Sequence, residues 1–189
     1  MKNKKVFIIY NPVSGRRTDK RNLIKTTLEK NQIGFDLYET KGHKDALDKA
    51  MNFEIEQYSA LLLVGGDGTI HEGLNGLMRR QDKKRVPVGL IPNGSGDDIC
   101  GSFNLQVNDT SSGLNYVLKG DVIKVDIVKI LIDCNSEEEL QECLNNDDNF
   151  KIEDHLRYSF INSNLCVSAN IAKNAASMKP KFGQHAYTI

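Results

Sequence analysis

The segment at residues 61–78, LLLVGGDGTIHEGLNGLM, constrains the fold more than any other part of the chain. Its apolar start is typical of a parallel strand buried on both faces, and it passes through Gly-Gly-Asp-Gly-Thr directly into a helical pattern. Glycines allow a backbone turn to approach a phosphate closely, and the start of the helix adds partial positive charge. Asp67 places a carboxylate in this turn, where it can hold Mg²⁺ or accept a proton from a hydroxyl group. A tight turn in which Asp67 only caps the helix is the structural alternative.

Strands alternate with helices along residues 1–120, which predicts a doubly wound α/β domain. Ligands of such domains bind outside the carboxyl ends of the strands, and each of the three Gly-rich turns in this chain follows a predicted strand. The predicted strands are residues 6–10, 35–39, 60–64 and 86–91, and the predicted helices are residues 18–30, 44–55, 69–80, a short one from 95, and 111–119.

Two further Gly-rich turns, YNPVSGRR at residues 10–17 and VGLIPNGSGDDIC at residues 88–100, are expected at the same edge of the sheet. Arg16 and Arg17 could neutralise phosphate, although adjacent arginines are more often surface charge. His71 is expected to be a solvated helix residue rather than a catalyst.

Capping boxes offer a purely structural reading of two of these turns. Thr69 with Glu72, and Ser95 with Asp98, have the spacing at which two side chains satisfy the free amides of a first helical turn. For Thr69 this interpretation is compatible with a role in ligand binding.

Residues 121–189 predict a different, β-rich second domain. Strands are expected at residues 122–132, 158–161 and 165–167, and residues 135–154 are expected to form a solvated acidic insertion with a short helix at 137–144. About 70 residues provide little core for a β domain, so we expect this second domain to be incomplete.

Charge and cysteine content exclude several classes of protein. The 189 residues include 25 Lys plus Arg and 25 Asp plus Glu, so no net field favours nucleic acid. The four cysteines lack metal-ligand spacing, which indicates reduced thiols and a cytoplasmic location. We also expect no signal peptide and no transmembrane segment, because the apolar runs are too short. Any membrane contact is therefore expected to be peripheral.

The motifs in combination resemble the catalytic domain shared by diacylglycerol, sphingosine and ceramide kinases and by bacterial lipid kinases. In order, they are N-P-x-S-G after the first strand, a Thr at the end of the second, GGDGTIHEGLNG, P-x-G-S-G, and VDIVKI at residues 125–130. RYSFIN and KFGQHAY near the end are also similar to the family, so the resemblance runs from Lys5 onward.

The resemblance implies ATP- and Mg²⁺-dependent transfer of the γ-phosphate to the hydroxyl of a lipid at a membrane surface. Asp67 matches the residue proposed as the base that takes the hydroxyl proton. The metal ligands, the oligomeric state and the choice among diacylglycerol, sphingosine and ceramide stay open. The residues that match the family's nucleotide site are Asn11, Thr40, Gly66, Asp67, Gly68, Thr69, Glu72 and Ser95.

Three departures from the family pattern bear on activity. Asp97 stands where the family usually has Asn, and an extra carboxylate near phosphates would repel them unless it binds metal or points away. Asn164 to Ser168 replaces a Gly-Phe-x-Ala-Asp segment that supplies a lipid-contacting Asp in some members. Relatives also continue past Ile189 with a further acidic segment, so we expect this chain to bind ATP but to transfer phosphate poorly.

Two alternatives remain at this point. An NAD kinase-like enzyme shares the G-G-D-G-T turn, but P-x-G-S-G and the sequence Glu72-x-x-Asn75-Gly76 favour the lipid kinases. A nucleotide-binding pseudokinase or regulatory module is the other alternative.

Overall fold

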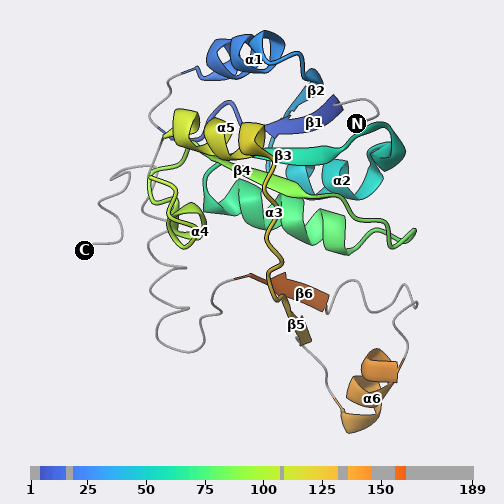
Figure 1. The fold of residues 1–189 in the computed structure, drawn as a ribbon. Helices are drawn as coiled ribbons and strands as arrows, with labels where there is room; N and C mark the ends of the chain where they lie inside the picture. Colours follow the sequence, from blue (N-terminus) through green and yellow to red (C-terminus); the bar gives the residue numbers. More distant parts are fainter. Residues whose placement is uncertain (1–4, 16–18, 107–108, 132–135, 146–155, 161–189) are drawn as a thin grey trace, which may run out of the picture.

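A parallel sheet of four strands forms the centre of the protein (Figure 1). The computed structural model describes residues 5–15, 19–106, 109–131, 136–145 and 156–160. The strand order is β2-β1-β3-β4, and every neighbouring pair is parallel. The strands are β1 (Lys5–Tyr10), β2 (Gly34–Glu39), β3 (Ala60–Gly65) and β4 (Val88–Pro92).

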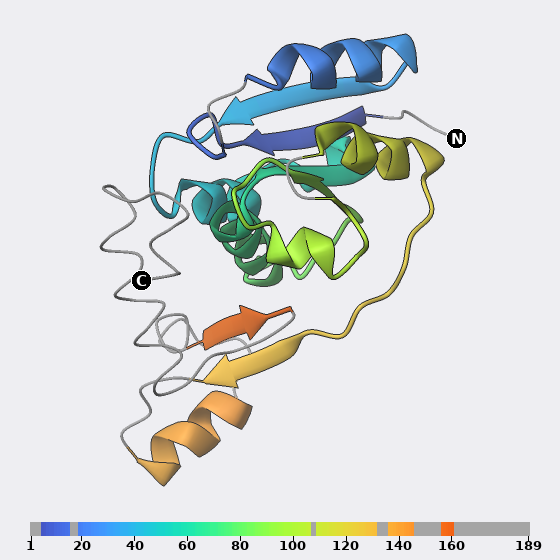
Figure 2. The ribbon, with the colours of Figure 1, turned by 90° about the vertical axis from the view of Figure 1, so that its left-hand side faces the viewer.

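Helices cover both faces of this sheet, which confirms the predicted doubly wound α/β fold (Figures 1 and 2). One face is covered by α1 (Arg21–Lys30) and α5 (Thr110–Lys119), and the other by α2 (Asp45–Asn52) and α3 (Asp67–Met78). A short 3-10 helix, η1 (Ile55–Gln57), precedes β3, and the four-residue α4 (Asp98–Gly101) contacts α3.

The two central strands supply both halves of the core. Their side chains alternate between the faces, so Phe7 and Ile9 pack with α2 and α3, whereas Val6 and Ile8 pack with α1 and α5. Along β3 every residue from Leu61 onward is buried, as the continuous apolar run predicts.

Helix α3 approaches its neighbours closely because two of its glycines have no side chain. A Cβ on Gly76 would lie 2.1 Å from the backbone oxygen of Leu47 in α2, and a Cβ on Gly73 would lie 2.4 Å from Cδ2 of Leu63 in β3. Both approaches fix the position of α3 against the sheet, and therefore the position of the turn that precedes it.

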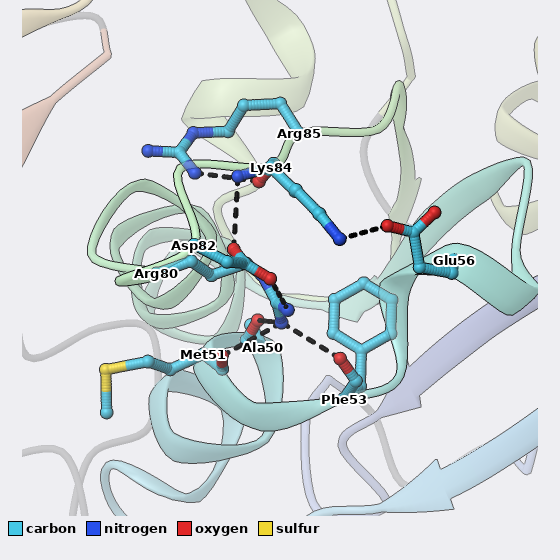
Figure 3. Close-up of polar contacts among 8 residues, drawn as sticks. All are labelled: Ala50, Met51, Phe53, Glu56, Arg80, Asp82, Lys84 and Arg85. Atoms are coloured by element: carbon cyan, nitrogen blue, oxygen red, sulfur yellow. Dashed lines mark hydrogen bonds and ion pairs between the residues drawn. The ribbon is translucent and has the colours of Figure 1, made fainter.

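The amino edge of the sheet holds a buried polar cluster around Arg80, whose side chain is 8% exposed (Figure 3). Its Nη1 donates to the carbonyls of Met51 and Phe53, both at 2.9 Å, and so binds the end of α2. Its Nε and Nη2 donate to Asp82 at 3.0 and 2.6 Å. These hydrogen bonds lower the pKa of Asp82 to about 2.

The second part of the chain contains an antiparallel pair, β5 (Val128–Leu131) with β6 (Leu156–Ser159), and the helix α6 (Glu137–Asn145). The predicted strand at 122–132 is thus shorter, the one at 158–161 begins two residues earlier, and the predicted acidic helix is confirmed. The strand predicted at 165–167 and the rest of the acidic insertion lie outside the described residues. In the ranges given above, no helix has the length and apolarity to cross a bilayer.

Candidate active site

The three Gly-rich turns meet at the carboxyl edge of the sheet. The backbone N–H of Asn11 donates to the carbonyl of Val64 at 2.9 Å, and that of Asn93 donates to the carbonyl of Gly65 at 3.0 Å. These bonds continue the parallel ladder past the ends of β1, β3 and β4. The turns therefore begin side by side.

Side chains then join the turns to one another. Asn11 Nδ2 donates to Thr69 Oγ1 at 2.8 Å, and Asn93 Nδ2 donates to Ser14 Oγ at 3.1 Å. Ser14 Oγ in turn donates to the carbonyl of Asn11 at 3.0 Å. Thr69 and Asn93 are buried, at 6% and 2% exposure, so these bonds form in a site largely shielded from water.

Two glycines bring the turn after β3 and the turn after β4 into backbone contact. A Cβ on Gly66 would lie 3.1 Å from Cα of Gly94, and a Cβ on Gly94 would lie 2.6 Å from Cα of Gly66. Gly68 differs from both, because it is exposed and a Cβ there would have no atom within 4 Å. The open space over the first turn of α3 is therefore at Gly68, while Gly66 serves the contact between the turns.

Asp67 is the first residue of α3, and its carboxylate reaches the turn after β4. Its Oδ1 accepts a hydrogen bond from the N–H of Ile99, in α4, at 2.9 Å. A Cβ on Gly96 would lie 3.4 Å from Asp67 Oδ2 and 3.9 Å from Asp98 Oδ2. The missing side chain of Gly96 thus leaves room beside two carboxylate oxygens.

Asp67 and Asp98 are the two carboxylates beside Gly96 that could hold a metal ion. Mg²⁺ is usually bound by one or two carboxylates together with substrate phosphates and water, rather than by a cage of protein ligands. Within the described part of the chain, no group of three or more acidic, His or Cys side chains is placed to hold a metal. Asp67 and Asp98 are therefore the candidate ligands.

Asp97, which departs from the family pattern, directs its side chain into its own turn. The residue is fully buried with a φ of +55°, a left-handed conformation that Asp tolerates, and its Oδ1 accepts the N–H of Gly94 at 2.8 Å. The carboxylate is used inside the turn. Burial, with Asp97 and Asp67 nearby, raises the pKa of the Cys100 thiol to about 12, so this buried cysteine is protonated at neutral pH.

Both predicted capping boxes are wrong. Helix α3 begins at Asp67 after an N-cap at Gly66 that makes no side-chain hydrogen bond, and Thr69 binds Asn11 instead. Glu72 Oε1 accepts the N–H of Lys44 at 3.0 Å, where α2 begins, and does not return to its own helix. Tertiary partners thus replaced the local ones.

The second box fails for a similar reason. Helix α4 begins at Asp98 with Asp97 as its N-cap, and the side chain of Asp97 satisfies the Gly94 amide within the preceding turn. Ser95 is left as an exposed residue of that turn.

The predicted nucleotide residues therefore fall into two groups along the edge. Asn11, Gly66, Asp67 and Thr69 are joined by contacts among the three turns, and Gly68 adjoins them. Thr40 follows β2, with its N–H bonded to the carbonyl of Tyr10 at 2.9 Å, and Glu72 contacts the start of α2. Sequence reasoning missed the joining roles of Ser14, Asn93 and Gly94, although all three lie in the motifs that it singled out. His71 is exposed, as expected, and Arg16, Arg17 and the segment 164–168 lie outside the described residues.

Comparisons with known proteins place the chain in a family and agree with its fold. Residues 5–130 match the family described as the diacylglycerol kinase catalytic domain. Diacylglycerol kinases of Staphylococcus carnosus (strain TM300) and of Staphylococcus saprophyticus are each 33% identical to the chain over 129 residues, which is 67% of this chain and 41% of each relative. The crystal structure of a diacylglycerol kinase from Bacillus anthracis str. Sterne has the same fold, with a TM-score of 0.57 and 22% identity over 70% of this chain and 47% of that one. The chain thus spans less than half the length of these relatives.

Proposed function

The chain belongs to the diacylglycerol kinase catalytic domain family, and from this premise we propose that it takes part in ATP-dependent phosphorylation of a lipid hydroxyl. The observation that carries the proposal is the junction of three Gly-rich turns around Asp67 at the carboxyl edge of the sheet. Residues 1–120 would bind the nucleotide, and residues 121–189 would contribute to the acceptor side. The acceptor would be met at a membrane surface by peripheral contact from the cytoplasm, and diacylglycerol is the acceptor that the relatives' names favour.

The nucleotide phosphates would lie over the first turn of α3. The 12 residues of α3 give its amino end partial positive charge, and the open space at Gly68 exposes backbone amides there. The remaining residues along the edge, Thr40, Glu72 and Ser95, would contact the rest of the nucleotide.

Of the two candidate ligands, Asp98 would hold Mg²⁺, and the ion would supply positive charge to the phosphates. Catalysis would otherwise depend on alignment, because phosphoryl transfer needs mainly positioning and charge stabilisation. Asp67 Oδ1 is held by the amide of Ile99, which leaves Oδ2 to accept the proton of the lipid hydroxyl. The deprotonated lipid oxygen then bonds to the γ-phosphorus, the bond from the γ-phosphorus to the oxygen that bridges to the β-phosphate breaks, and ADP leaves.

Calorimetry with Mg-ATP tests the phosphate site. Gly68→Ala should lower the affinity at least about tenfold, because the added methyl occupies the space proposed for phosphate. The melting temperature should not fall, since that methyl meets no atom of the protein within 4 Å. Gly101→Ala, at another open helical glycine, is the matched control and should leave the affinity unchanged. Equal ATP affinity in wild type and Gly68→Ala would contradict the assignment.

Acceptor assays then test the reaction. Labelled ATP with mixed micelles of diacylglycerol, sphingosine or ceramide should label diacylglycerol preferentially. Labelling of NAD instead would favour the NAD kinase-like alternative. Because this chain is expected to transfer phosphate poorly, ATP binding without transfer would favour the regulatory alternative only if it persists in an active full-length context.

A further inference from the structure

The side chain of Asn75 contacts a strand that lies 83 positions further along the chain. Its Nδ2 donates to the carbonyl of Tyr158 at 3.0 Å, and its Oδ1 accepts the N–H of the same residue at 2.9 Å. Asn75 is 1% exposed, so both bonds are shielded from water. One amide side chain thus satisfies both backbone groups of a strand residue, as a neighbouring strand would.

A second residue of the same helical stripe contacts the same strand. Arg79 Nη2 donates to the carbonyl of Leu156. Four residues of helix rise by about 6 Å, and two residues of strand extend by about 6.6 Å. Asn75 and Arg79 therefore match Tyr158 and Leu156 in register, with the strand running opposite to the helix.

These contacts cover the edge of β6 that does not pair with β5. Tyr158 lies opposite Lys129 in the antiparallel pair, and its N–H and C=O both go to Asn75. A free strand edge otherwise exposes a row of unpaired backbone groups. These hydrogen bonds accordingly hold the antiparallel pair of β5 and β6 on α3. Of the two strands, β6 is the one next to α3 (Figures 1 and 2).

We propose that Asn75, assisted by Arg79, is a positioning residue that fixes the antiparallel pair of β5 and β6 relative to the candidate phosphate site. Both ends of the connection lie on one helix, because Asp67 begins α3 and Asn75 lies about 12 Å along its axis. Because the helix is rigid, it sets the distance between Asp67 and the strand pair that Asn75 holds. The functional consequence, alignment of the lipid hydroxyl with Asp67, rests on the proposed function.

Hydrogen exchange on the 189-residue chain tests the connection without reference to activity. Asn75→Leu keeps the branched shape of the side chain but loses the donor and the acceptor. Amides of residues 128–131 and 156–159 should then exchange at least about tenfold faster, while those of β3 stay protected. Asn75→Asp keeps the acceptor and loses the donor, so its effect should be intermediate. Asn52→Leu, an exposed Asn on α2 that bonds only its own helix, is the matched control and should change nothing.

Unchanged protection of β6 in Asn75→Leu would overturn the proposal, because an apolar side chain would then hold the strand pair equally well. Should Asn75→Leu lose protection in β3 as well, Arg79→Met gives the same test from beyond the end of the helix. Mg-ATP affinity should stay within about twofold of wild type, and transfer should show a raised KM for diacylglycerol with an unchanged KM for ATP. A wild-type chain that binds no ATP would contradict the proposed function and leave the exchange result standing.

Discussion

Asp67 has an observed structural role and, in the proposed function, a catalytic one, and sequence reasoning treated the two roles as alternatives. Its Oδ1 accepts the amide of Ile99, which is a structural role, while its Oδ2 borders the space beside Gly96. The structural role differs from the expected one, because Asp67 binds the start of α4 and not that of its own helix. The two tasks use different oxygen atoms, so different substitutions can separate them.

Asp67→Asn should retain the fold and lose the reaction. The amide oxygen can still accept the Ile99 N–H, so the melting temperature should change little. In an active full-length context, loss of a general base should slow lipid phosphorylation by about 10²- to 10⁴-fold. Asp67→Ala is the companion variant and should also lose about 1 kcal/mol of stability with that hydrogen bond. Turnover in Asp67→Asn within a few-fold of wild type would mean that the carboxylate is only structural.

Elements were predicted well where their pattern depends on burial, and less well at their ends. The continuous apolar run of β3 and the alternation of strands and helices gave the fold class and placed the three turns at one edge. The capping boxes failed because long-range partners took the groups that local capping requires, as Asn11 did with Thr69 and Lys44 with Glu72. No local pattern could reveal the contact of Asn75 with Tyr158 either, since it depends on how the second part packs on α3.

The close contact of α2 with α3 makes a prediction that opposes helix propensity. Gly76→Ala should destabilise the protein by about 1–3 kcal/mol, because the new methyl would lie 2.1 Å from the Leu47 carbonyl oxygen and 2.9 Å from the Ala50 side chain. Propensity alone would favour Ala by about 1 kcal/mol. Urea unfolding measures the difference.

Gly101→Ala is again the control, because a Cβ there is open to solvent and should stabilise the protein by about 0.4–1 kcal/mol. If Gly76→Ala were as stable as wild type, the two helices would not be in close backbone contact.

In the α/β part, the proposed nucleotide site and a cluster that stabilises the fold lie at opposite edges of the sheet. The three turns lie at the carboxyl edge of the sheet, and the cluster of Arg80 and Asp82 binds the ends of helices at the amino edge (Figure 3). Substitutions in this cluster should therefore change stability without altering the residues proposed to bind nucleotide.

Acid sensitivity tests this separation. Arg80 holds the pKa of Asp82 at about 2, below its ordinary value of 3.8. A lowered folded-state pKa means that the carboxylate stabilises the protein above about pH 4 and that this contribution is lost as pH falls toward 2. Asp82→Asn should thus melt below wild type at pH 7, and the difference should close between pH 4 and 2.

Asp19→Asn is the parallel case at the other edge, since Arg21 holds the pKa of Asp19 at about 2 as well. A difference between Asp82→Asn and wild type that stays constant from pH 7 to pH 2 would contradict the ion pair with Arg80.

The separation of 83 positions between Asn75 and Tyr158 also determines the order in which the protein can assemble during synthesis. At about 5–20 residues per second, the ribosome delivers Tyr158 roughly 4–17 s after Asn75. During that interval the parallel sheet of the nascent chain can form, and the surface of α3 that later contacts β6 is exposed to water. Asn75 and Arg79 have polar side chains that water can solvate during this interval. Leucines at these positions would expose apolar surface on the nascent chain. A hydrogen-bonded contact can thus form late without exposing the growing polypeptide to aggregation.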